Sequence, residues 1–191
     1  MITLKRRHIL LYSGLAAVLS AGLATLFFIG PRWLTTAVPT DTPTASTTDD
    51  ARKIRARLLY VADDGVHLSP VEQEVIYGEG AVEQAKRIIE AQLVQPKAPL
   101  VSAIPPDTTL KTIFLTSRGD AYVDLSAEVQ KNHRGGTTSE ILTAYTLVSA
   151  LTLNLPAITG VQILVDGREV DTLAGHLDLR RPLEQDLRWI K

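Results

Sequence analysis

The residue types that could do chemistry in this chain are few, and the first of them are His176 and Asp178. They lie two positions apart, so a strand would put both side chains on one face, as a pair of metal ligands requires. Two ligands do not make a metal site, and no further histidine or acid is tied to them by spacing. We therefore interpret them as a structural pair, with His176 hydrogen-bonded near a sheet edge, and expect no metal ion or cofactor.

Ser139 is the candidate nucleophile, with His133 or His176 as its base. Such catalysis also needs an acid that orients the histidine, and nothing in the sequence fixes one. The G-x-S-x-G elbow of serine hydrolases does not occur, and cysteine is absent, which excludes thiolate nucleophiles and cysteine zinc sites. We therefore expect that the protein is not an enzyme.

Two loops carry weaker candidates for ion binding. Residues 133–136 (HRGG) precede a predicted helix, whose backbone N–H groups attract anions, and the Arg134 guanidinium would add to that attraction. Residues 63–65 (DDG) offer carboxylates for calcium but lack the D-x-D-x-D-G spacing of an EF-hand loop. We prefer to interpret residues 133–136 as a connector and residues 63–65 as a turn, without ion binding at either loop.

The element that must position these residues is a predicted helix within residues 137–155. Thr137 and Glu140 have the T-x-x-E spacing of a capping box, which predicts that the helix begins here, and Pro156 ends it. Apolar residues occupy nearly every side, so the helix must be covered all round as the centre of the core. These apolar residues are Ile141, Leu142, Ala144, Tyr145, Leu147, Val148, Ala150, Leu151 and Leu153.

Strands and a second helix are predicted around this central helix. The order is ββα-ββα-ββ, which predicts an α+β fold with two helices packed on a mostly antiparallel sheet. The tight turn Asp166-Gly167 joins the last two strands as a hairpin. The predicted strands are 55–61, 67–77, 113–117, 121–125, 161–165 and 169–173. The second helix is 81–93, with a predicted buried face of Ala81, Val82, Ala85, Ile88, Ile89 and Leu93.

A long apolar run near the N-terminus predicts a transmembrane helix. Ile9–Ile29 contains 21 residues without a charge and spans roughly 30 Å as a helix, the thickness of the hydrocarbon core of a bilayer. Three basic residues, at 5–7, precede it and only Arg32 follows, so the N-terminus is expected inside and the folded domain outside the cytoplasm. A cleaved signal peptide is the alternative, although its apolar region is usually shorter, about 7–15 residues.

These patterns divide the chain into a cytoplasmic tip and anchor (1–32), a Thr/Pro/Ser-rich linker (33–54) and a folded domain (55–191). Four of the 20 basic residues and none of the 21 acidic residues lie in the first part, so the remainder carries a formal net charge of −5. Nucleic-acid binding depends on basic side chains that neutralise phosphates, so nucleic acid is not an expected partner.

The folded part resembles the GerMN domain family, which is named for a spore-germination protein. The resemblance covers about residues 55–184 and rests on many short segments that occur in the family's order. These segments are Leu58–Val61, the helix from Ala81, Ser102–Pro106, Ala121–Ser126, Glu140, Leu151–Leu153, Val161–Gly167, Gly175–Leu179 and Pro182-Leu183.

The resemblance implies a bacterial domain outside the cytoplasm, tethered to the membrane or anchored by lipid, without known catalysis. It also implies similarity to the small ring-building modules of envelope machines. The chain has a single copy of the domain, where some relatives have two, and it has a predicted transmembrane anchor and no cysteine for lipidation. We therefore do not infer a specific role in sporulation for this chain from the resemblance.

We expect a non-catalytic module that docks on another envelope protein or on a copy of itself. The predicted partner surface consists of Lys86 and Arg87, on the wetted face of the helix 81–93, and of Val170 and Thr172, on the predicted edge strand 169–173. No small-molecule substrate is evident. The alternatives are an enzyme that acts on peptidoglycan, or its regulatory subunit, and a sensor of a small ligand.

Overall fold

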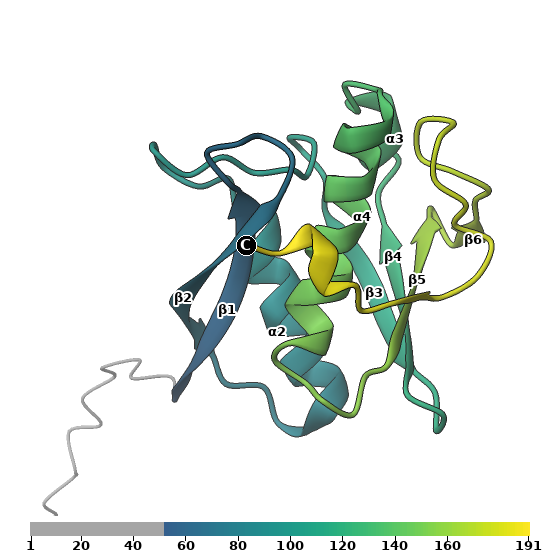
Figure 1. The fold of residues 1–191 in the computed structure, drawn as a ribbon. Helices are drawn as coiled ribbons and strands as arrows, with labels where there is room; N and C mark the ends of the chain where they lie inside the picture. The colour runs from purple at the N-terminus through teal and green to yellow at the C-terminus, as the bar shows by residue number, and fades with distance from the viewer. Residues whose placement is uncertain (1–51) are drawn as a thin grey trace, which may run out of the picture. The chain divides into compact units, whose positions relative to one another are not determined.

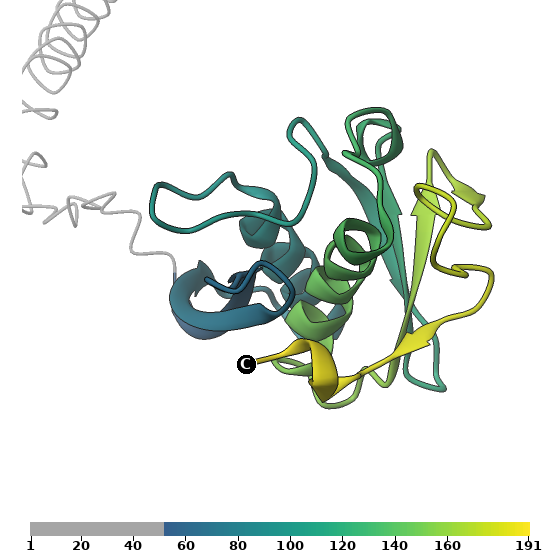
Figure 2. The same ribbon diagram turned by 45° about the horizontal axis from the view of Figure 1, so that its top comes forward.

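The computed structural model describes residues 52–191, which form two sheets with helices between them (Figure 1). The same three layers are visible from a second direction in Figure 2. The predicted anchor Ile9–Ile29 lies outside the described residues. Within residues 52–191, no helix has both the length and the apolar character needed to cross a membrane. The predicted α+β class is confirmed.

The first layer is a hairpin of β1 (Lys53–Val61) and β2 (Leu68–Ile76), which pair antiparallel along their whole length. The connecting turn is held by Asp64, whose carboxylate accepts hydrogen bonds from the backbone N–H groups of Val66 (3.0 Å) and His67 (3.1 Å). The structural interpretation of the acidic segment 63–65 as a turn therefore fits its geometry.

The opposite layer is a sheet in the order β3-β4-β5-β6, with β7 also paired to β5. Its strands are β3 (Leu110–Leu115), β4 (Asp120–Leu125), β5 (Gly160–Val165), β6 (Arg168–Glu169) and β7 (Leu183–Glu184). The pair β4–β5 is parallel, because the long helix between them returns the chain to the same end of the sheet. Four of the five strand pairs within residues 52–191 are antiparallel, as predicted, but the prediction of a single sheet was wrong because the strands divide into two sheets.

The middle layer consists of α2 (Gly80–Leu93) and α4 (Thr137–Thr152). The short α3 (Glu128–Lys131) lies in the connection from β4 to α4, and the 3₁₀ turn η2 (Leu187–Trp189) follows β7. Helix α4 contacts α2, β1 and β5, and its fully buried apolar residues are Ala144, Leu147, Val148, Ala150 and Leu151. A helix enclosed by both sheets must be apolar nearly all round. The prediction of a central core helix is confirmed.

The start of α4 was predicted at the correct residue for an incorrect reason. The N-cap is Gly136, with φ of 87°, and within the part of the chain that the structure describes no side-chain hydrogen bond caps the helix there. Glu140 does not return to the N-terminus as a capping box requires, because its carboxylate binds a distant loop described below.

The buried face of α2 also differs from the prediction. Ala85, Ile88 and Ile89 are fully buried, but Ala81 is exposed and Val82 is 47% exposed, and Gln84 and Gln92 are buried in their place. Both amides are tolerated because they hydrogen-bond to backbone: Gln84 Oε1 accepts the N–H of Gly78 at 3.0 Å, and Gln92 binds β1.

Candidate functional site

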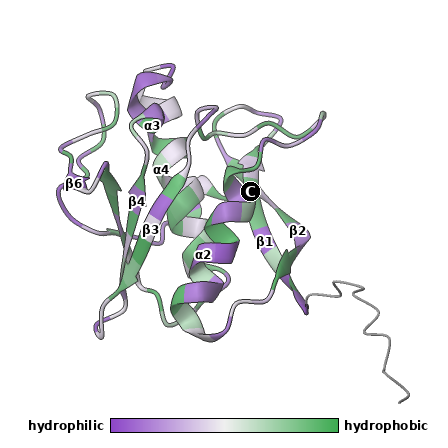
Figure 3. Cartoon of the chain, turned by 180° about the vertical axis from the view of Figure 1, so that it is seen from behind, coloured by the Kyte–Doolittle hydropathy of each residue, from purple (hydrophilic) through white to green (hydrophobic). Residues whose placement is uncertain are grey.

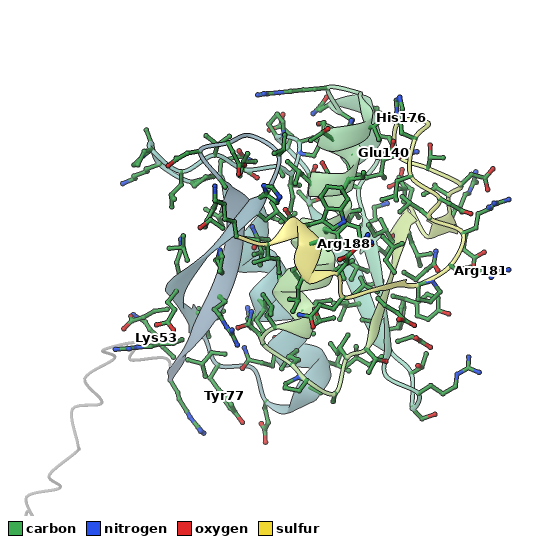
Figure 4. The ribbon with its side chains drawn as sticks, viewed as in Figure 1. Lys53, Tyr77, Glu140, His176, Arg181 and Arg188 are labelled. Carbon is green, nitrogen blue, oxygen red and sulfur yellow. The ribbon has the colours of Figure 1, made fainter. Side chains whose placement is uncertain are left out.

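The carboxylate of Glu140 organises the loop 173–177, which runs beside the N-terminal half of α4 (Figure 4). The side chain is fully buried. Its Oε1 accepts the backbone N–H groups of Leu173 (2.7 Å) and Ala174 (3.0 Å), and its Oε2 accepts that of His176 (2.8 Å). Burial raises the pKa of Glu140, but the backbone N–H donors lower it by more, so that the pKa lies below its ordinary value. Glu140 is therefore an ionised structural carboxylate.

His176 and Asp178 do not form a pair. The His176 Nδ1 lies 3.3 Å from Glu140 Oε2, whereas Asp178 accepts hydrogen bonds from the Arg180 guanidinium at 2.7 and 2.9 Å. These bonds hold the pKa of Asp178 well below its usual range. The two residues lie in a loop and not in a strand, so the predicted common face does not exist. No group of three or more potential metal ligands occurs within residues 52–191.

His133 is also occupied by structural contacts. Its Nδ1 accepts the N–H of Gly135 at 2.9 Å, and its Nε2 lies 3.3 Å from the hydroxyl of Thr143. Burial lowers the pKa of His133; Glu140 raises it and His176 lowers it again, and the net direction is down. Among the described contacts, the Ser139 hydroxyl makes no hydrogen bond to His133 or to His176. The arrangement therefore does not assemble the nucleophile and base that the sequence offered.

A groove of about 600 Å³ opens at the N-terminal end of α4, between the β1–β2 turn and the Pro-rich segment 101–106. Apolar groups dominate its wall, and Arg134 is its charged residue. The lining comprises Val61, Gly65, Gln95, Val101, Ser102, Ala103, Ile104, Pro105, Pro106, Asn132, Arg134, Thr138, Ser139 and Leu142. This geometry suits an apolar ligand or an extended segment of chain.

The predicted partner residues of α2 lie in a network of ion pairs. The Arg87 guanidinium contacts Glu83 at 3.0 Å and Glu90 at 3.3 Å, and the Lys86 ammonium lies 4.0 Å from Glu90. All of these side chains are between 38% and 44% exposed. The face thus presents both signs of charge at a partly wetted surface.

The predicted edge strand 169–173 was wrong in its length. Strand β6 ends at Glu169, and beyond it the Thr172 carbonyl accepts the amide of Gln130 at 3.0 Å. Val170 packs partly buried against the core. Farther along, the backbone N–H groups of Leu173 and His176 bond to the Glu140 carboxylate of α4 and not to a strand.

Two residues that sequence reasoning missed close the outer edge of β1. Asn154 accepts the N–H of Arg57 and donates to its carbonyl, both at 2.8 Å, and Gln92 makes the same pair of bonds with Leu59, also at 2.8 Å. Each amide thus replaces one residue of a neighbouring strand. A lone Asn or Gln gives no sequence signal for this role, since nothing in its spacing shows which backbone it meets.

Known proteins match the described domain in sequence and in fold. The profile of the Germane family, described as "Sporulation and spore germination", matches residues 57–171. A candidate lipoprotein from Clostridium perfringens is similar in structure, at 25% identity and a TM-score of 0.50 over 70% of this chain and 88% of that chain. No curated protein matches the chain.

Two solved structures of the sporulation protein GerM from Bacillus subtilis share the fold. Its first GerMN domain is 20% identical, with a TM-score of 0.51 over 70% of this chain and 96% of that chain. Its tandem GerMN domains are 16% identical, with a TM-score of 0.52 over 71% of this chain and 46% of that chain. The chain therefore spans about half the length of the tandem pair.

Proposed function

The chain belongs to the Germane family, and from this premise we propose that its folded part is a non-catalytic interaction module of the bacterial cell envelope. The module is tethered outside the cytoplasmic membrane by the helix Ile9–Ile29 and docks on another envelope protein or on a copy of itself. Two observations support the location: the uncharged N-terminal run with its preceding basic residues, and the similarity to a candidate lipoprotein.

The proposal that the module is non-catalytic is supported by the structural contacts that its buried polar side chains make. Glu140 is fully buried, and its carboxylate is saturated by backbone donors of the loop 173–177. His133 and His176 are engaged with Thr143 and with Glu140. Catalytic acids and bases must be free to exchange a proton with a substrate, and these groups instead hold the fold together.

The partner surface is proposed at Lys86 and Arg87, with Val170 and Thr172 as its second part. The charged face of α2 supports it, because mixed charges at a surface give specific, salt-dependent recognition. Val170 and Thr172 contribute through side chains and not through strand pairing, since the chain has left the sheet there.

Photo-crosslinking in living cells tests this proposal. A photoreactive residue is placed at Lys86 or at Thr172 of the full-length chain, and a control is placed at Arg55, whose side chain on β1 is 83% exposed. We expect protein adducts from Lys86 or Thr172 at several times the yield from Arg55. Equal yields at all three positions, with loss of a wall-cleaving activity in Ser139→Ala, would favour the enzyme alternative.

The groove at the N-terminus of α4 favours a second candidate, the ligand sensor. Its volume of about 600 Å³ falls within the range of small-molecule sites, roughly 300–1,000 Å³, and its wall is mainly apolar. A screen of apolar fragments by NMR would detect this function as shifts confined to residues such as Leu142 and Val101.

A further inference from the structure

The chain protects the edges of its sheets unequally, which is informative because an open edge offers unpaired N–H and C=O groups to another strand. On β2, every second residue from Leu68 to Ile76 points its backbone N–H and C=O positions away from β1. The Leu68 carbonyl accepts the N–H of Lys191 at 2.9 Å, and Pro70 has no N–H to offer. Glu72 and Glu74 follow at the next outward positions and add charge to this edge. Strand β2 is therefore poorly suited to pairing.

The outer edge of β1 is closed over most of its length. The amides of Asn154 and Gln92 occupy the backbone groups of Arg57 and Leu59, as described above, and the Val61 N–H donates to the Val101 carbonyl at 2.8 Å. On the far side of the second sheet, β6 has only two residues and offers little length for pairing.

Strand β3 is the contrasting case. Within residues 52–191 it pairs only with β4, and the bond from the Thr116 N–H to the Asp120 carbonyl (2.9 Å) shows that residues 112, 114 and 116 point their backbone groups toward β4. Ile113 and Leu115 therefore point theirs outward, and these groups have no backbone partner within residues 52–191. Figure 3 shows β3 at the near edge of its sheet, with α2 beside it.

Strand β3 also carries an exposed aromatic ring. Phe114 is 57% exposed on the face of the sheet turned away from the helices, whereas its neighbour Ile113 is buried on the inner face. The strand contains no proline and no acid, and its one charge, Lys111, contacts Asp166 at 2.6 Å. A short, apolar, unprotected edge with an exposed ring is what strand addition requires.

We propose that β3 pairs antiparallel with β3 of a second copy of this chain, about a two-fold axis at Phe114. This inference rests on the proposed function, of which it specifies one partner and one surface. In this register Ile113 of each copy exchanges two backbone hydrogen bonds with Leu115 of the other, and the two Phe114 rings face each other directly.

Self-complementarity argues for a second copy as the occupant. In this register the segment Ile113–Leu115 pairs with the same segment of the second copy, since the residues beyond Leu115 lie in the β3–β4 turn. The paired segment carries no charge, so no charge opposes a like charge. An interface between identical copies must satisfy this condition at every position, because the same patch supplies both sides.

The absence of cysteine from the natural chain permits a direct test. In the full-length chain, Phe114→Cys puts two thiols at facing positions with Cα atoms about 4.5 Å apart, within the range for a disulfide. Thr112→Cys on the same strand and Val94→Cys, at a position that is 65% exposed elsewhere, are matched controls. Membranes from cells that express each variant are oxidised with copper phenanthroline and analysed without reductant.

We expect a disulfide-linked dimer from Phe114→Cys at a yield at least fivefold above either control. A yield equal to that of Val94→Cys overturns the proposal, a dimer formed preferentially by Thr112→Cys overturns its register, and a link to a different protein overturns its occupant. Phe114→Glu in the otherwise natural chain should reduce chemical crosslinking between copies at least threefold, while Val94→Glu should not. The proposed function is judged separately, by adducts from Lys86 and Thr172.

Discussion

At the scale of single residues, Glu140 explains more of this structure than any motif in the sequence. Its carboxylate fixes the backbone of the loop 173–177, which lies beyond the end of β6. Sequence reasoning placed Glu140 near a helix start correctly but assigned its carboxylate to the wrong partner. A glutamate three residues after a threonine can bond back to the helix N-terminus or to a distant loop. The spacing is the same in both cases, so only the tertiary structure shows which contact forms.

Glu140→Gln should destabilise the domain by about 2 kcal/mol, because the new NH₂ group replaces one charged acceptor and confronts a backbone donor. Urea unfolding of the fragment 50–191 at pH 7 measures this loss, and Glu83→Gln, at a partly exposed ion pair, is the control. A loss no larger than that of the control would show that the Glu140 contacts do not stabilise the loop.

The same residue predicts a pH dependence. Since the pKa of Glu140 is lower in the folded state than its ordinary value of 4.5, its contribution to stability is fully present above that value. It is lost as the pH falls through the lower, folded-state pKa. As the pH is lowered from 5, the free energy of unfolding of Glu140→Gln should therefore fall less steeply than that of the natural chain. Urea unfolding at a series of pH values measures this difference.

At the scale of elements, α4 and the hairpins could be predicted, but the pairing between elements could not. Apolar residues all round 141–153 indicated a core helix, and Asp166-Gly167 indicated the turn after β5. Two facts had no local signal: the division into two sheets and the parallel pair β4–β5. Both follow from long-range contacts, including the amides of Gln92 and Asn154 that occupy the edge of β1.

Two substitutions compare a confirmed core position with one that the helical pattern misplaced. Leu147 is fully buried in α4, so Leu147→Ala should cost roughly 2–4 kcal/mol through the cavity it leaves. Val82 was predicted to be buried but is 47% exposed, so Val82→Ala should cost less than about 0.5 kcal/mol. Urea unfolding of the fragment 50–191 measures both, and similar losses at the two positions would contradict the packing of α2 and α4.

At the scale of the whole molecule, the chain joins a domain of the Germane family to a predicted membrane tether. Membership of the Germane family and the α+β fold were predictable from the sequence, because short matching segments recur in order along residues 57–171. The proposed partner surface rests on features that the sequence does not show. Exposure of a strand edge or of a ring such as Phe114 depends on what the rest of the chain covers.

Every partner that we propose lies outside the cytoplasm, so the side of the membrane on which the domain lies is the central claim. The direct measurement fuses two reporters, in separate strains, after Lys191 of the full-length chain: alkaline phosphatase, which matures outside the cytoplasm, and a fluorescent protein that matures only inside. The account predicts high phosphatase activity and no fluorescence, with the protein in the membrane fraction. Fluorescence without phosphatase activity would place the domain in the cytoplasm and contradict the account.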